Sequence, residues 1–100
     1  MRPSSHPERP DRALAMHGYL EKLGLLEGTV QIPGREASKD EITLCHDAEH
    51  VDRVAAFDRD DIKITEDTYA CAATPLAARL AVGTTIDVAI AVAEGRAQNG

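Results

Sequence analysis

The chemically richest stretch of this chain is residues 6–12, which read HPERPDR. An imidazole, two carboxylates and two guanidinium groups stand beside two prolines. Each proline fixes its own φ and disfavours helical geometry in the residue before it, so the loop is stiff. Two interpretations follow: a polar N-terminal tail that ends where a helix begins, or a loop that positions groups for a binding or catalytic site formed elsewhere.

A second candidate is the segment 46–50, which matches H-x-x-E-H, the inverted zinc-peptidase pattern. Two histidines four residues apart share one helix face, so His46 and His50 together can ligate Zn²⁺, with the intervening glutamate as general base. A third ligand would have to come from Asp87 or Glu94. The same pattern also suits the solvated surface of a helix, and this is the interpretation that we favour.

Three other groups are better explained as structure than as chemistry. His17 lies beside an apolar helical stripe, which predicts a partly buried structural histidine. Cys71, followed by small residues, predicts a packed small hydrophobe. Residues 58–67 are dense in acid, but they lack the D-x-[DN]-x-[DN]-G pattern and its glycine, so we expect a solvated acidic loop rather than a metal-binding loop.

The elements that would position these groups are mostly helical. Apolar spacing predicts a first helix from about Pro10 to Leu23 with Gly24 as its stop. Further signals predict a strand at Thr29–Ile32, a helix opened by the capping box Ser38–Glu41, a helix over Ala48–Phe57, and a last helix over 74–94 with Thr74 as N-cap and Pro75 at its first position.

The last helix is apolar on nearly every side between Ile86 and Ala93, so it should be buried on every side. The other expected elements are too few to cover it. The sequence therefore predicts an incomplete domain, whose sheet and covering layer lie beyond Gly100 or in another chain.

Composition and charge indicate the size of the domain, its cellular compartment and the kinds of partner that it is not expected to bind. The chain has 100 residues, 43% of them hydrophobic but only 3% aromatic, which fits one small domain with a weak core. A formal net charge of −6 without a basic patch argues against nucleic-acid binding. Two cysteines form no disulfide framework, so a reducing, intracellular compartment is expected. We identify no secretory signal and no apolar run long enough to span a membrane.

Taken in order, several segments resemble the zinc-dependent histone deacetylases, closest to the class II type. The segment 6–12 is similar to the family's HPExPxR loop. Four further stretches are similar to segments of the family, in the same order. The first is 19–25, and the second joins Arg35-Glu36-Ala37, the helix of Glu41 and residues 46–51. The third joins Asp67-Thr68-Tyr69 to Thr74, Ala77, Ala81 and Gly83, and the fourth joins Glu94-Gly95 to Asn99-Gly100.

The resemblance implies an α/β fold, in which residues 6–100 supply the N-terminal, mostly helical portion of an arginase/deacetylase-like α/β sandwich with a mostly parallel sheet. Residues 1–5 would be a disordered tail. The family's R-P-P-G-H-H segment and its zinc ligands are absent from these residues. We therefore expect residues 6–100 to be a part of the deacetylase domain that is truncated before the catalytic core. We expect this part to contain no catalytic or metal-binding residue, and zinc to be bound only in the complete domain.

The resemblance also assigns site residues. The stretch from His6 to Pro10, with His6, Pro7 and Glu8 as the candidate site residues, matches a loop at the rim of the acyl-lysine tunnel. Arg12 aligns with an arginine of an internal channel associated with product acetate. His50 stands where the family usually has tyrosine. The complete domain would hydrolyse N-acetyl-lysine amides in acetylated histones or other acetyl-lysine proteins. It would act in the nucleus or cytoplasm, in chromatin regulation and within a co-repressor complex. No direct contact with nucleic acid or membrane is expected.

Two alternatives stay open. One is a non-catalytic helical module that binds a protein partner through its last helix, which is rich in alanine and valine. The other is a small zinc protein that uses His46 and His50.

The sequence predicts the 100-residue chain alone to be inactive as a deacetylase.

Overall fold

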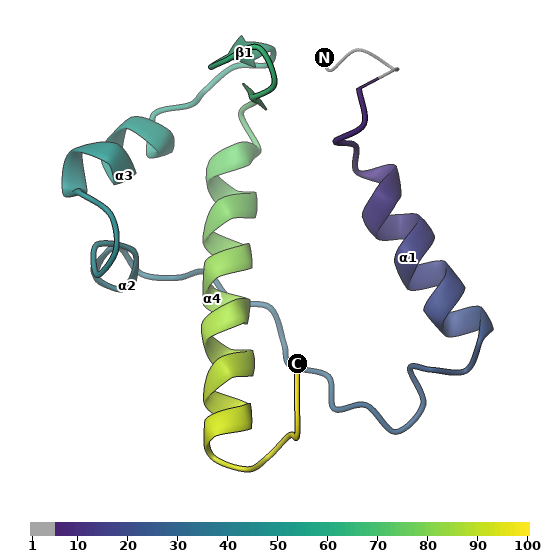
Figure 1. Ribbon diagram of the computed structural model, residues 1–100. Helices are drawn as coiled ribbons and strands as arrows, with labels where there is room; N and C mark the ends of the chain where they lie inside the picture. The colour runs from purple at the N-terminus through teal and green to yellow at the C-terminus, as the bar shows by residue number, and fades with distance from the viewer. Residues whose placement is uncertain (1–5) are drawn as a thin grey trace. The chain divides into compact units, whose positions relative to one another are not determined.

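The computed structural model describes residues 6–100, and the chain divides into two compact units, Met1–Gln31 and Ile32–Gly100 (Figure 1). The disordered tail predicted at residues 1–5 lies outside the described residues.

The first unit contains helix α1, Asp11–Lys22, close to its predicted bounds. It ends as the sequence predicts, because Gly24 adopts a positive φ of 70° and the N–H groups of Gly24 and Leu25 bond to the carbonyls of Glu21 and Leu20. No residue of α1 is buried. The prediction of a partly buried His17 is therefore wrong for this structure, because no element of the same unit covers the helix.

The predicted strand at Thr29–Ile32 is also wrong. These residues form no regular structure, and Thr29 instead closes a turn in which its N–H and its hydroxyl both donate to the carbonyl of Leu26. A strand needs a neighbour to accept its backbone hydrogen bonds. Within the described residues, the one strand pair lies elsewhere in the chain.

The second unit starts with two short helices, α2 at Lys39–Ile42 and α3 at Ala48–Ala55. The predicted capping box is present: the Ser38 hydroxyl accepts from the N–H of Glu41 at 3.2 Å, and the Glu41 carboxylate accepts from the N–H of Ser38 at 2.8 Å. Both helices lie along one side of helix α4, Thr74–Ala93 (Figure 1).

A small hairpin interrupts the expected acidic loop. Strand β1, Ile62–Lys63, pairs antiparallel with β2, Tyr69–Ala70, with Ile62 opposite Ala70. The acidic side chains of this region are exposed, as predicted, but the prediction of a continuous loop missed the hairpin. Residues 6–100 contain no parallel strand pair, so the mostly parallel sheet stays a prediction about the complete domain.

Helix α4 begins one residue earlier than predicted. Thr74 is its first helical residue rather than its N-cap, and Ala73 precedes it without a side-chain cap. The Thr74 hydroxyl faces back and accepts from the N–H of Cys71 at 2.9 Å. This hydroxyl also donates to the Cys71 sulfur, which lowers the pKa of the Cys71 thiol, together with backbone N–H groups at the start of the helix.

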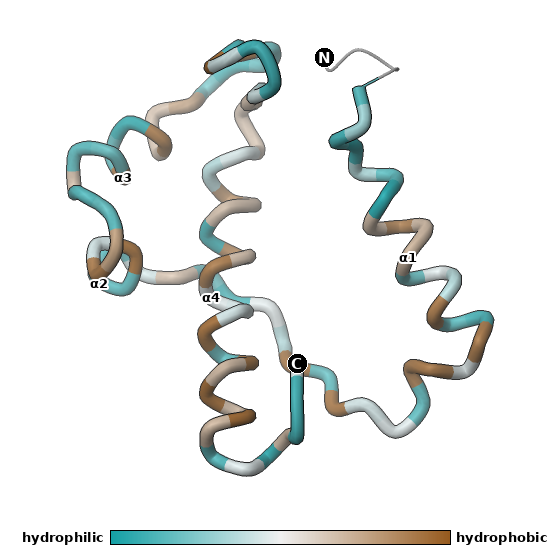
Figure 2. The backbone as a smooth tube through the Cα atoms, viewed as in Figure 1, coloured by the Kyte–Doolittle hydropathy of each residue, from teal (hydrophilic) through white to brown (hydrophobic). Residues whose placement is uncertain are grey.

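The core of the second unit consists of small side chains. Its buried apolar residues are Ala37, Ala70 and Ala91. Helix α4 is apolar over most of its length, as Figure 2 shows, and by length and composition it is long and apolar enough to cross a membrane, as core helices of soluble proteins also are. The prediction that no apolar run reaches this length is therefore wrong, because Arg79 and Asp87 interrupt the run but leave the helix apolar on average. Its buried residues are limited to Pro75, Gly83 and Ala91, which confirms that the described elements leave most of it uncovered.

Candidate functional site

The loop at residues 6–12 is organised by short-range polar contacts with the first turn of α1. Arg12 Nη1 donates to Glu8 Oε2 at 2.5 Å, and the N–H of Glu8 donates to His6 Nδ1 at 3.1 Å. The structure thus links three of the four predicted site residues through hydrogen bonds, and Pro7 lies in the chain between His6 and Glu8. Residues 6–9 form no regular structure before α1, and the stiffness of this loop stays a prediction.

The Arg12 side chain is 56% exposed and that of Glu8 is 61% exposed. An exposed ion pair contributes little to stability, because water screens it. The contact therefore orients the Arg12 guanidinium more than it stabilises the loop. In this contact the guanidinium donates to a carboxylate oxygen of a neighbouring side chain.

The second unit contains a larger polar cluster, formed by Arg35, Glu41 and Asp87, which the sequence analysis did not predict. Arg35 Nη1 and Nη2 donate to the two carboxylate oxygens of Glu41 at 3.0 and 2.8 Å. Its Nε donates to both oxygens of Asp87, at 3.0 and 2.9 Å. One guanidinium thus joins the capping box of α2 to the middle of α4, which lies 52 residues away in sequence.

The cluster perturbs the protonation of its members. The side-chain hydrogen bonds from Arg35, followed by the backbone N–H of Ser38, lower the pKa of Glu41 to about 2. The hydrogen bond to Glu41 and, to a smaller extent, the hydrogen bond to Asp87 raise the pKa of Arg35 above its ordinary value. Both groups therefore stay ionised throughout the neutral and mildly acidic range.

The segment 35–37 crosses α4 at Gly83, where the two backbones come unusually close. A Cβ on Gly83 would lie 2.2 Å from the carbonyl oxygen of Arg35 and 2.8 Å from the nitrogen of Ala37. The N–H of Ala37 donates to the Arg79 carbonyl at 2.9 Å, and Arg79 Nε donates to Glu36 Oε1 at 2.8 Å. Only glycine allows this approach.

The sequence contains a signal for this crossing. Arg79 and Asp87 are the two charged residues of an otherwise uncharged helix, and Gly83 lies midway between them. Residues four apart share a helix face, so all three point to one side. A charged segment lying across that side could have been predicted, whereas Asp87 was considered only as a zinc ligand.

His46 and His50 do come together, but without a third ligand. Their rings stack with centroids 5.2 Å apart and an interplanar angle of 28°. Among residues 6–100, no group of three His, Cys, Asp or Glu side chains is placed to hold a metal ion. Of the proposed third ligands, Asp87 is bound to Arg35, and Glu94 accepts from Arg96 Nε at 2.9 Å.

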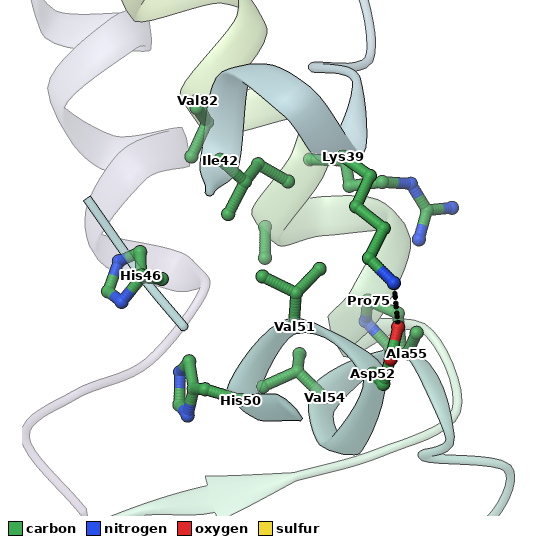
Figure 3. A pocket seen from close by; sticks show the side chains of 12 residues that line it. Lys39, Ile42, His46, His50, Val51, Asp52, Val54, Ala55, Pro75 and Val82 are labelled. Carbon is green, nitrogen blue, oxygen red and sulfur yellow. Dashed lines mark hydrogen bonds and ion pairs between the residues drawn. The ribbon is translucent and has the colours of Figure 1, made fainter. Parts of the chain in front are cut away.

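The two histidines lie at a pocket between α2, α3 and α4 (Figure 3). Its volume is about 320 Å³, and its lining is mainly aliphatic, including Ile42, Val51 and Val82. An ion pair between Lys39 Nζ and Asp52 Oδ1, at 2.5 Å, closes one side. The pocket holds no nucleophile next to a base, and it therefore provides no catalytic arrangement of its own.

Comparisons with known proteins agree on one family. A family model described as histone deacetylase domain matches residues 6–100. Histone deacetylase 15 of Arabidopsis thaliana is 40% identical over 97 residues, and histone deacetylase clr3 of Schizosaccharomyces pombe is 31% identical over 108 residues. The crystal structure of the HDA15 HD domain matches all of this chain with a TM-score of 0.91 and 38% sequence identity.

These matches cover nearly all of this chain but a small part of each relative. They span 95% of this chain and 18% of histone deacetylase 15, and 94% of this chain and 16% of clr3. The structural match spans 29% of the HDA15 HD domain chain.

Proposed function

The chain belongs to the histone deacetylase domain family, and we propose that residues 6–100 form the early, mostly helical part of a domain that hydrolyses N-acetyl-lysine amides. The match of the whole chain to the HDA15 HD domain, at a TM-score of 0.91, carries this proposal. Acetylated histones are the proposed substrate, because both named relatives are histone deacetylases. The proposed setting is the nucleus or cytoplasm, within a co-repressor complex in chromatin regulation.

In this proposal, the complete domain is an arginase-like α/β sandwich with a mostly parallel sheet. The family match and the structural match support the deacetylase fold. The parallel strands would come from the larger part of the domain, since the described strands are one short antiparallel pair.

The proposed role of residues 6–12 is at the substrate tunnel and the channel beneath it. His6, Pro7 and Glu8 would form part of the tunnel rim. Arg12 would bind the carboxylate of product acetate through charge-assisted hydrogen bonds. Its contact with the Glu8 carboxylate supports this role, because acetate presents the same chemical group.

Zinc does not fit the residues described here. The family implies a catalytic zinc ion, but residues 6–100 offer no group of three suitable ligands. We therefore derive no catalytic step through a metal on this chain and place the proposed ligands in the part of the domain that the 100 residues do not include. It follows that the 100-residue chain alone should show no deacetylase turnover.

The test is a chimera in which this chain replaces the matching 29% of the HDA15 HD domain. Its hydrolysis of an acetyl-lysine peptide is measured beside that of the parent domain. Arg12→Ala in the chimera should lower the rate, whereas Arg9→Ala should have a smaller effect, because Arg9 pairs with the neighbouring Asp11 outside the proposed channel role. Equal rates for both variants would overturn the assignment of Arg12.

A further inference from the structure

The pocket between α2, α3 and α4 has no role in the proposed function (Figure 3). Helical spacing explains why two of these helices each turn one side toward it. On α4 the pocket is lined by Pro75, Ala78 and Val82, which are separated by three and four positions, and on α3 by Val51 and Val54. Residues with these separations share a helix face. Side chains that are distant in sequence therefore meet around one concave apolar site.

The size of the pocket suits a small molecule. Its volume of about 320 Å³ lies at the lower end of the range of about 300–1,000 Å³ that is usual for ligand pockets. An apolar cavity of about 150 Å³ is large enough for benzene, so this pocket has room for a molecule roughly twice that size. Ile42, Val51 and Val54 are only half-buried. An apolar ligand would remove more of their surface from water, which favours binding.

The charged groups that line the pocket are already paired within the chain. Lys39 donates to Asp52 at one side of the pocket, and Arg79 donates to Glu36. A carboxylate ligand would have to compete with Asp52 for Lys39, and an amine would have to compete with Lys39 for Asp52. In either case a new ion pair would replace an existing one, with little net gain. These contacts therefore favour an uncharged ligand.

Hydrogen-bonding groups lie on the other side of the pocket, where the rings of His46 and His50 stack (Figure 3). Within residues 6–100, no hydrogen bond joins either ring to another residue. A neutral imidazole has one N–H donor and one acceptor nitrogen, so it can bond to a hydroxyl or a carbonyl group. The two histidines thus offer a place for one polar group beside the apolar lining.

We propose that this pocket binds a small uncharged molecule with an aliphatic chain and one hydroxyl or carbonyl group. The chain would lie among Ile42, Val51 and Val82, and the polar group would hydrogen-bond to His46 or His50. Such a ligand would contact α2, α3 and α4 together and would stabilise their packing by mass action. The inference does not rest on the proposed function, because it concerns binding and not hydrolysis.

The test titrates the 100-residue chain with 1-octanol and follows the methyl groups of Ile42, Val51, Val54 and Val82 by two-dimensional NMR. We expect saturable shifts of these methyl signals. Octanoate and octylamine have the same number of carbon atoms but carry a charge. Each should bind about fivefold more weakly, which corresponds to the loss of one exposed ion pair. Equal binding of octanol and either charged compound would overturn the assignment to an uncharged ligand.

Two leucine variants test the location of the site. Ala78→Leu fills part of the pocket and should weaken octanol binding about tenfold, the effect of excluding roughly two methylene groups. Ala77→Leu is the matched control, because the neighbouring residue of α4 is exposed and does not line the pocket. This control should leave octanol binding unchanged. Alanine and leucine both favour a helix, and equal effects of the two variants would overturn the proposed location.

The double variant with alanine at His46 and His50 tests the polar group. It should weaken octanol binding by about two- to tenfold, the range for one lost hydrogen bond, while the methyl shifts at Val51 and Val82 persist. Unchanged affinity would overturn the role of the two histidines.

Circular dichroism checks that each protein keeps its helices, and the chimera of this chain with the HDA15 HD domain replaces the 100-residue chain if that chain is unfolded. Absence of saturable shifts in both proteins would overturn the inference. Shifts at the exposed Leu76 and Ile90 as large as those in the pocket would also overturn it, since they indicate adsorption without a specific site. Deacetylation by a chimera that binds no octanol would leave the proposed function intact, and octanol binding without deacetylation would do the reverse.

Discussion

The carbonyl oxygen of Arg35 lies against the backbone of Gly83, so close that a Cβ at Gly83 would be 2.2 Å from it. The approach allows the segment 35–37 to lie across α4. It brings the Arg35 guanidinium to Asp87 and the N–H of Ala37 to the Arg79 carbonyl. A single glycine in the helix thus determines how the first part of the second unit attaches to α4.

Gly83→Ala should destabilise the chain by about 1–3 kcal/mol, the range for overpacking a close contact. The added methyl meets backbone atoms, which cannot move aside as a flexible side chain can. Gly18→Ala is the matched control, because a Cβ at Gly18 meets nothing within 4 Å in the exposed helix α1. It should stabilise by about 0.5–1 kcal/mol through helix propensity. Urea unfolding measures both, and equal changes would contradict the crossing.

Arg35→Ala should lower the unfolding temperature more than Arg35→Lys does, and both should lower it more than Arg53→Ala. Lysine offers one compact charge and cannot hold two carboxylates in the fork geometry of a guanidinium. Alanine leaves Glu41 and Asp87 facing each other without a cation. Arg53 is exposed on α3 and serves as the control. Thermal unfolding followed by circular dichroism gives the order, and an Arg35→Lys variant as stable as the parent would contradict the bridging role.

Stability should fall at acidic pH because of Glu41. Its pKa is lowered from an ordinary 4.5 to about 2 in the folded chain. Between these values the unfolded chain binds a proton that the folded chain does not, so the stabilisation is complete above pH 4.5 and disappears as the pH falls through about 2.

Urea unfolding across this pH range should show a shallower loss for Glu41→Gln, which lacks the titrating group. Glu49→Gln, on the exposed surface of α3, should retain the loss seen in the parent chain. If the parent chain and Glu41→Gln lose stability in parallel, the ion pair with Arg35 does not govern the acid response.

His46 and His50 should bind no stoichiometric zinc in this chain. Their stacked rings lack a third ligand, and the proposed ligand Asp87 is bound to Arg35. Zinc content after dialysis, measured by mass spectrometry, should be the same for the parent chain and for the double variant with alanine at both positions. Loss of one equivalent of zinc in the double variant would support the small zinc protein instead.

The features that the sequence predicted well are local ones. The capping box of Ser38 and Glu41 and the glycine stop of α1 depend on residues within a few positions of one another. The strand at Thr29–Ile32 was wrong because strand formation depends on a distant partner.

The same distinction applies to the candidate site. The contacts within the segment 6–12 join residues two and four positions apart, so they depend on local residue types and spacing. The cluster of Arg35, Glu41 and Asp87 requires a contact between residues 52 positions apart. The local signals of this cluster are the charge of Asp87 in an apolar helix and Gly83 one turn before it. They indicate that another segment contacts this side of the helix, but they do not identify that segment.

The most direct test of the account is the rate at which the chimera of this chain and the HDA15 HD domain hydrolyses an acetyl-lysine peptide. If residues 6–100 supply the early part of a deacetylase domain, the chimera should work within about tenfold of the parent domain, a difference of about 1.4 kcal/mol in transition-state stabilisation. The 100-residue chain assayed beside it should give no turnover. A folded chimera without deacetylase activity would contradict the account.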